Sequence, residues 1–131
     1  MIEKIEIIVD ADACPVKDEV YKVAERCNLA VKLVSNSYFR IPREAWIQLI
    51  VVDNNFDAAD DRIVEIVNNQ SIVITADILL AQRCLEKESV VLSPKGQIFD
   101  LQSIGMAVAT RNLMQDLRAG GDQITRQAPF D

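Results

Sequence analysis

Short β-rich runs alternate with amphipathic helical patterns along most of this 131-residue chain, and this alternation constrains the fold more than any other feature. The β-rich runs occupy residues 4–9, 29–35, 46–52 and 71–75, with shorter runs at 89–93 and 97–100. Apolar residues at helical spacing predict helices that begin near Pro15 and at Asp57, and others over residues 76–87 and 101–118. Strands that alternate with helices form right-handed βαβ units, so we predict an α/β fold, a three-layer α/β/α sandwich with a mainly parallel central sheet.

The length of the chain favours one domain. Half of the residues are hydrophobic, which is enough for one compact core. We expect a single α/β domain over residues 1–118 and a flexible tail over residues 119–131, where two glycines interrupt the last helical pattern. The sequence shows no cationic leader with an apolar segment and no apolar run longer than a strand, so we expect a cytoplasmic protein without a membrane partner.

Charge and residue usage exclude several classes of function. The net charge is −6, from 20 acidic and 14 basic residues, so any contact with nucleic acid has to be local. The chain contains no histidine, which excludes Ser-His-Asp and Cys-His nucleophiles and histidine-based zinc hydrolases. Carboxylates remain, and these hard oxygen ligands suit Mg²⁺ or Mn²⁺.

Aspartates follow three of the predicted strands. Asp10 and Asp12 come after the first β-rich run, Asp53 after the third, and Asp77 after the run at 71–75. Ligands of parallel sheets bind outside the carboxyl ends of the strands, where the loops converge. We therefore expect neighbouring strands to bring Asp10, Asp53 and Asp77 to one edge of the sheet.

Further aspartates, Asp57, Asp60 and Asp61, open the second predicted helix at mutual spacings that place them near one another. Two carboxylates about 5 Å apart repel by roughly 3 kcal/mol at an effective dielectric near 20, so an acidic pocket must be protonated, solvated or bound to a cation. A divalent cation can polarise a phosphoryl oxygen and lower the pKa of an attacking water. The acids thus allow metal-dependent phosphodiester hydrolysis.

Each candidate residue also has a structural explanation. Asp57 and Asp77 fit the caps of the helices that follow them. Thr75 is a β-forming residue as well as a hydroxyl, and Arg111 fits an exposed or ion-paired side chain as well as a phosphate contact. Cys14 stands near a helix start, but no second cysteine lies at CxxC spacing, so we favour a packed thiol over redox chemistry.

Four motifs in order closely resemble the YaiI/YqxD family of uncharacterised bacterial proteins: "DADACPVKDEV" at 10–20, "DAADDRIVEIV" at 57–67, "ITADILLA" at 74–81 and "PKG" at 94–96. The family is regarded as PIN-like, so the resemblance implies an α/β/α sandwich related to metal-dependent ribonucleases. In PIN-type nucleases, acids after the first strand, on a central helix and after a later strand bind Mg²⁺ or Mn²⁺. By this resemblance the catalytic acids are Asp10, Asp12, Asp60, Asp61 and Asp77, and all of these except Asp61 are candidate metal ligands.

Together, the residues and the resemblance predict a PIN-like domain that hydrolyses phosphodiester bonds of RNA or DNA with Mg²⁺ or Mn²⁺. Asp10 and Asp77 are the main expected ligands, and Thr75 and Arg111 are candidate substrate contacts. The expected partner is single-stranded nucleic acid. The alternative is a non-catalytic domain that keeps the PIN-like fold and binds nucleic acid or protein.

Overall fold

A computed structural model describes residues 5–55 and 57–119 of the chain. In chain order its elements are β1 (Glu6–Asp10), the 3-10 helix η1 (Ala11–Ala13), α1 (Lys17–Cys27), β2 (Ala30–Ser35), β3 (Ile47–Val51), α2 (Ala58–Ile66), β4 (Ser71–Ile74), α3 (Ile78–Leu85), β5 (Val90–Leu92), β6 (Ile98–Phe99) and α4 (Leu101–Ala119). Each predicted strand and helix is present, with small differences at the ends. The short helix η1 is not anticipated by the sequence pattern.

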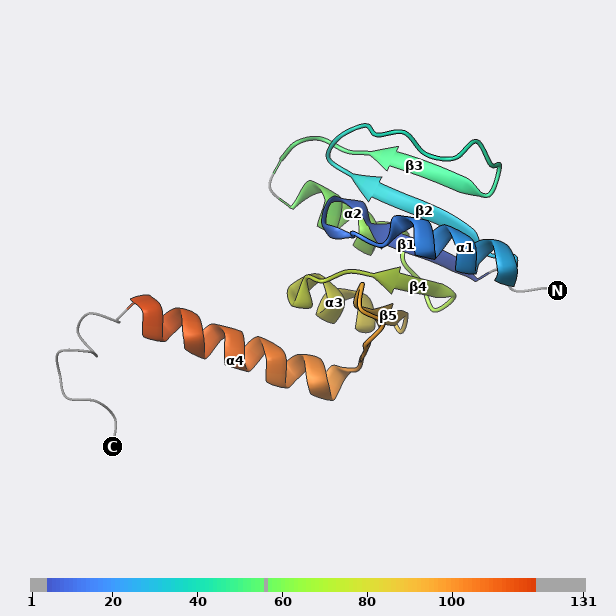
Figure 1. Ribbon diagram of the computed structural model, residues 1–131. Coiled ribbons are helices and arrows are strands. Elements are labelled where there is room, and N and C mark those ends of the chain that lie inside the picture. The colour runs from blue at the N-terminus through green and yellow to red at the C-terminus, as the bar shows by residue number, and fades with distance from the viewer. Residues whose placement is uncertain (1–4, 56, 120–131) are drawn as a thin grey trace.

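The six strands form one sheet in the order β3-β2-β1-β4-β5-β6. All neighbouring pairs are parallel except β5 and β6, which form an antiparallel pair. The arrows of β2, β3 and β4 accordingly point the same way in Figure 1. The chain proceeds outward from β1 to β2 and β3, then returns to place β4 on the other side of β1. This reversal makes the crevice between β1 and β4 the place where ligands of such sheets bind.

Helices cover both faces of the sheet and enclose two apolar clusters. Along β1, successive side chains alternate between faces, so Ile8 joins one cluster and Ile7 and Val9 join the other. The cluster around Ile8 is completed by side chains of α2, α3 and the start of α4, and the second cluster by side chains of α1. These layers confirm the predicted three-layer sandwich. Cys14 is buried in the second cluster, as expected for a packed thiol.

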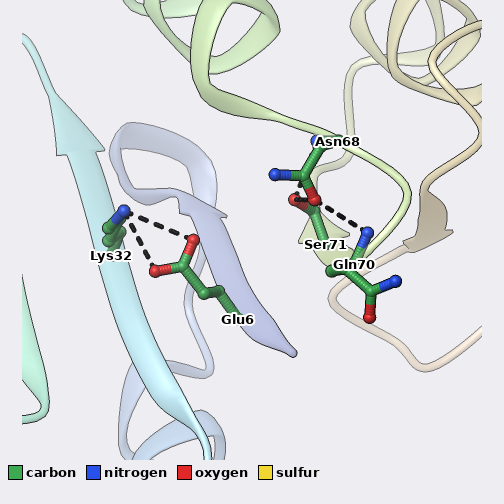
Figure 2. A network of polar contacts seen from close by, with 5 residues as sticks. All are labelled: Glu6, Lys32, Asn68, Gln70 and Ser71. Carbon is green, nitrogen blue, oxygen red and sulfur yellow. Dashed lines mark hydrogen bonds and ion pairs between the residues drawn. The ribbon is translucent and has the colours of Figure 1, made fainter. Parts of the chain in front are cut away.

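Polar contacts tie the amino ends of the central strands together (Figure 2). The ammonium group of Lys32 on β2 lies 3.0 Å from a carboxylate oxygen of Glu6 on β1. Before β4, the backbone N–H of Asn68 donates to the hydroxyl of Ser71 at 3.0 Å. The N–H of Glu6 donates to the carbonyl of Gln70 at 3.1 Å. The starts of β1 and β4 are thus held side by side, which sets the register of the pair.

This register decides which residues meet at the carboxyl edge. Val9 pairs with Ile74, so the next residues, Asp10 and Thr75, lie beside each other. Asp53 does not join them, because β2 separates β3 from β1. The prediction that the three strands end at one edge of the sheet is confirmed, because all of them are parallel, but the prediction that the strand before Asp53 is a direct neighbour of β1 is wrong.

The last helix, α4, packs against α3 through its first turns and then projects beyond the rest of the domain (Figure 1). Ile104 is fully buried in the α2–α3 cluster, whereas Leu113 and Met114 in the projecting half are exposed. Apart from Ala119, the last residue of α4, the predicted tail lies outside the described residues. Among the helices described, none has the length and apolar character to cross a membrane.

Ile8→Ala should destabilise the domain by about 2–5 kcal/mol, because it leaves a cavity beneath the central strand. Ile8 is fully buried, whereas Ile98 on β6 is 71% exposed. The matched change Ile98→Ala should alter the free energy of unfolding by no more than about 0.5 kcal/mol. Urea denaturation of both variants measures the difference. Equal losses would contradict the assignment of β1 to the core.

Candidate active site

Asp10, the last residue of β1, is the most buried of the candidate acids, with 7% of its surface exposed. The hydroxyl of Thr75 donates a buried hydrogen bond of 2.8 Å to its carboxylate. Burial raises the pKa of Asp10, and the nearby charges of Asp77 and Asp12 raise it further, whereas the bond from Thr75 lowers it. Thr75, predicted as a substrate contact, therefore has a structural role as the donor that positions Asp10.

Asp77 stands at the start of α3 and caps it. One of its carboxylate oxygens accepts from the backbone N–H groups of Leu79 and Leu80 at 2.9 and 3.2 Å. Its own N–H donates to the hydroxyl of Thr75 at 3.0 Å. The capping explanation thus holds for Asp77, and the same hydroxyl links it to Asp10. Asp57, the other proposed cap, forms no side-chain capping hydrogen bond.

Asp60, in the first turn of α2, is half-buried and completes the group. Burial is the main reason that its pKa is raised to about 6. The carboxylates of Asp77 and Asp10 add to this rise in the pKa of Asp60, and the guanidinium of Arg83 opposes it. Three carboxylates from β1, α2 and the start of α3 therefore lie within electrostatic reach of one another in the crevice between β1 and β4.

Asp12 lies in η1 beside this group, but its hydrogen bonds are to β2 and the residue after it. Its two carboxylate oxygens accept from the hydroxyl of Ser35 at 2.7 Å and from the backbone N–H of Asn36 at 2.9 Å. Neither Ser35 nor Asn36 was predicted to belong to the site. Their positions at the end of the predicted strand 29–35 and directly after it are the signal that could have indicated them.

The remaining candidates are placed differently. Asp61 is largely exposed and forms an ion pair of 3.0 Å with Arg83 of α3, a partner that the sequence did not indicate. Arg111 is exposed on α4, in the helix that projects from the domain (Figure 1). Over residues 5–55 and 57–119, Arg111 forms no ion pair with any acid.

The donor chemistry of the site fits a hard divalent cation, since the side chains that would hold it are carboxylates, the oxygen ligands that Mg²⁺ and Mn²⁺ prefer. In the part of the chain that the structure describes, no three or more His, Cys, Asp or Glu residues are arranged as a ready-made metal site. The contacts explain why: Asp77 is engaged as a helix cap and Asp12 with Ser35 and Asn36. Repulsion also keeps free carboxylates apart.

Thr75→Val should destabilise the protein by about 1.5–3 kcal/mol near pH 7, because it removes the donor to a buried carboxylate. Thr75→Ser keeps the hydroxyl and loses only a methyl group, so it should cost about 1 kcal/mol. Urea denaturation of the two variants and the wild type compares these free energies of unfolding. A valine variant as stable as the serine variant would contradict the positioning role of Thr75.

Asp60→Asn should stabilise the metal-free protein above pH 6 and have less effect as the pH falls. The pKa of Asp60 rises from 3.8 to about 6 on folding, so the folded state binds more protons between these values. The contribution of Asp60 to the free energy of unfolding of the wild type therefore falls as the pH rises through that window. The asparagine variant has no titrating group at this position, so it does not lose this contribution. Melting temperatures in EDTA across the window test this. A constant difference between variant and wild type would contradict it.

Comparison with known proteins identifies close relatives. The chain is 56% identical over 125 residues to a UPF0178 protein of Sphingopyxis alaskensis. The matched segment covers 95% of this chain and 81% of the relative. A UPF0178 protein of Brucella ovis is 53% identical over 125 residues, covering 95% of this chain and 78% of the relative. No solved structure matches. Residues 8–131 match the family model described as "Uncharacterized BCR, YaiI/YqxD family", and the chain therefore belongs to the YaiI/YqxD family.

Proposed function

We propose that this protein hydrolyses phosphodiester bonds in single-stranded nucleic acid with the help of Mg²⁺ or Mn²⁺. The observation that carries the proposal is that Asp10, Asp60 and Asp77 lie close enough to shift pKa values within the group, at the carboxyl ends of β1 and β4, where the strand order reverses. Carboxyl groups whose pKa is raised by burial and by neighbouring charges, as in Asp10 and Asp60, are enriched at functional sites. The resemblance to PIN-type nucleases supports the same chemistry.

The residues would divide the work according to their contacts. Asp10 would be the main ligand, because the hydroxyl of Thr75 fixes its carboxylate at the carboxyl edge of the sheet. Asp77 contributes the oxygen that does not cap α3. Asp60, with a pKa of about 6 without a cation, exchanges its proton readily near neutral pH and is suited to act as a ligand or a general base.

When bound, the cation would polarise a phosphoryl oxygen and make an attacking water more acidic. Asp12 and Asp61 support the site from its margins. Asp12 is fixed by Ser35 and Asn36, and Asp61 retains Arg83 near the acids. The guanidinium of Arg83 in turn lowers the pKa of Asp60, which the neighbouring carboxylates raise.

The alternative is a non-catalytic domain that binds nucleic acid or protein. The observation that favours it is the engagement of Asp77 and Asp12 in hydrogen bonds of the protein itself. Such acids are satisfied without a cation. Cation binding and cleavage must therefore be measured separately.

Millimolar Mn²⁺ or Mg²⁺ should raise the melting temperature of the wild type, because a ligand that binds only the native state stabilises it. Asp10→Asn and Asp77→Asn should abolish this response and reduce cleavage of single-stranded RNA by at least about 100-fold. Without metal these variants should be as stable as the wild type or more so, since asparagine removes a repelling charge and still accepts the hydrogen bonds.

Asp116→Asn is the matched control, because Asp116 is an exposed aspartate on α4. It removes one charge and should leave both the thermal response and the cleavage unchanged. Stabilisation by metal without cleavage would support the binding domain. A wild type that shows no thermal response to either cation would refute the proposed site.

A further inference from the structure

The loop between β2 and β3, residues 36–46, carries aromatic and basic side chains as it runs from the carboxyl end of β2, beside Asp12, to the amino end of β3. Its side chains alternate: Phe39 and Ile41 pack against the α1-side cluster, whereas Tyr38 and Arg40 are exposed. Tyr38 is 79% exposed, an unusual position for a large aromatic side chain in a monomeric domain. Because two residues of the loop are held in the core, the exposed pair is displayed from a supported backbone.

Further contacts hold the beginning of the loop against the site. The N–H of Asn36 donates to Asp12 at 2.9 Å, and the side-chain amide of Asn36 donates to the carbonyl of Asp53 at 2.9 Å. The ammonium group of Lys17 lies 5.3 Å from the centre of the Phe39 ring. Lys17 also donates to the carbonyl of Cys14 at 2.9 Å. The loop is thereby attached to η1 and to the start of α1, beside the acids.

The loop borders a surface hollow of about 460 Å³. Tyr38, Arg40 and Arg43 line it, together with Glu44. In the described ranges 5–55 and 57–119, neither arginine forms an ion pair with an acid. Two arginines against one acid give this hollow a local positive charge in a chain whose net charge is −6.

We propose that this hollow binds a single strand of nucleic acid, with Arg40 and Arg43 contacting phosphates and Tyr38 stacking on a base. A phosphate backbone matches the two guanidinium groups, and an exposed aromatic ring beside them matches an unstacked base. A duplex offers no free base face to Tyr38, and a net charge of −6 disfavours the extended basic surface that duplex binding requires. As a surface that holds the substrate strand, the hollow rests on the proposed nuclease function.

Binding is tested with the full chain and fluorescein-labelled oligouridylate in EDTA, so that cation-dependent cleavage cannot contribute. Tyr38→Ala should weaken binding by about fivefold or more, whereas Tyr38→Phe should change it by less than about twofold, because it keeps the ring. Arg40→Ala with Arg43→Ala should weaken binding and lower the slope of log affinity against log salt by about 1.4, which is about 0.7 for each phosphate contact.

Matched controls distinguish an effect of the loop on binding from an effect of the net charge of the protein. The double variant Arg62→Ala with Lys87→Ala removes the same charge from exposed positions on α2 and just beyond α3, and should bind as the wild type does. Oligothymidylate in place of oligouridylate distinguishes DNA from RNA as the source of the strand, and binding of either by the loop supports the inference. A matching duplex should bind more weakly than the single strand.

Three results would overturn the inference: no binding of either single strand, unchanged binding by the Tyr38 and arginine variants, or equal weakening by the control variant. Cleavage in Mn²⁺ is scored separately. Loop-dependent binding without any cleavage supports this surface and refutes the nuclease. Cleavage that survives the loop substitutions with unchanged affinity supports the acids and refutes the surface.

Discussion

The parallel pairing of β1 with β4 is the interaction on which the rest of the structure depends. It joins the two directions in which the chain builds its sheet, and its register places Asp10 beside Thr75. Side chains alternate between the faces of a strand, so a slip of one residue would turn Thr75 to the other face and leave Asp10 without its donor. The hydrogen bond from Glu6 to Gln70 at the opposite end protects this register.

The cost of gathering acids at one edge explains the polar contacts there. Asp10 is buried and needs the hydroxyl of Thr75, because a buried carboxylate without a hydrogen-bond donor lowers the free energy of unfolding. Asp77 is stabilised by the amides of α3, and Asp61 by Arg83. These contacts let the acids coexist without a cation, yet the pKa values of Asp10 and Asp60 remain raised. Burial and the neighbouring carboxylates therefore still penalise the charged forms of Asp10 and Asp60.

The acids are negatively charged, whereas the loop after β2 carries two arginines, and hydrogen bonds to Asp12 connect the start of the loop to the acids. Asp12 accepts hydrogen bonds from Ser35 and Asn36, so the residue nearest the acids also holds the start of the loop. A polyanionic substrate would be repelled by carboxylates alone, and arginines elsewhere on the loop would attract it. The arrangement suits a ligand whose negative backbone must come close to negative side chains.

Local spacing in the sequence determined much of the fold. Alternating β-rich and helical runs predict the three layers, and the positions of Asp10 and Asp77 after strands predict their common edge. The absence of histidine leaves carboxylates as the candidate chemistry. Spacing of this kind decides which side of a strand or helix a residue occupies, because both elements have fixed periods.

Only the tertiary structure decided which elements are neighbours and which of several partners each side chain takes. It placed β2 between β1 and β3, which removed Asp53 from the crevice. It directed Asp12 to Ser35 and Asp61 to Arg83, residues 23 and 22 positions away in the chain. The physical reason is that strand order and long-range hydrogen bonds depend on how whole layers pack, and no short stretch of sequence contains that information.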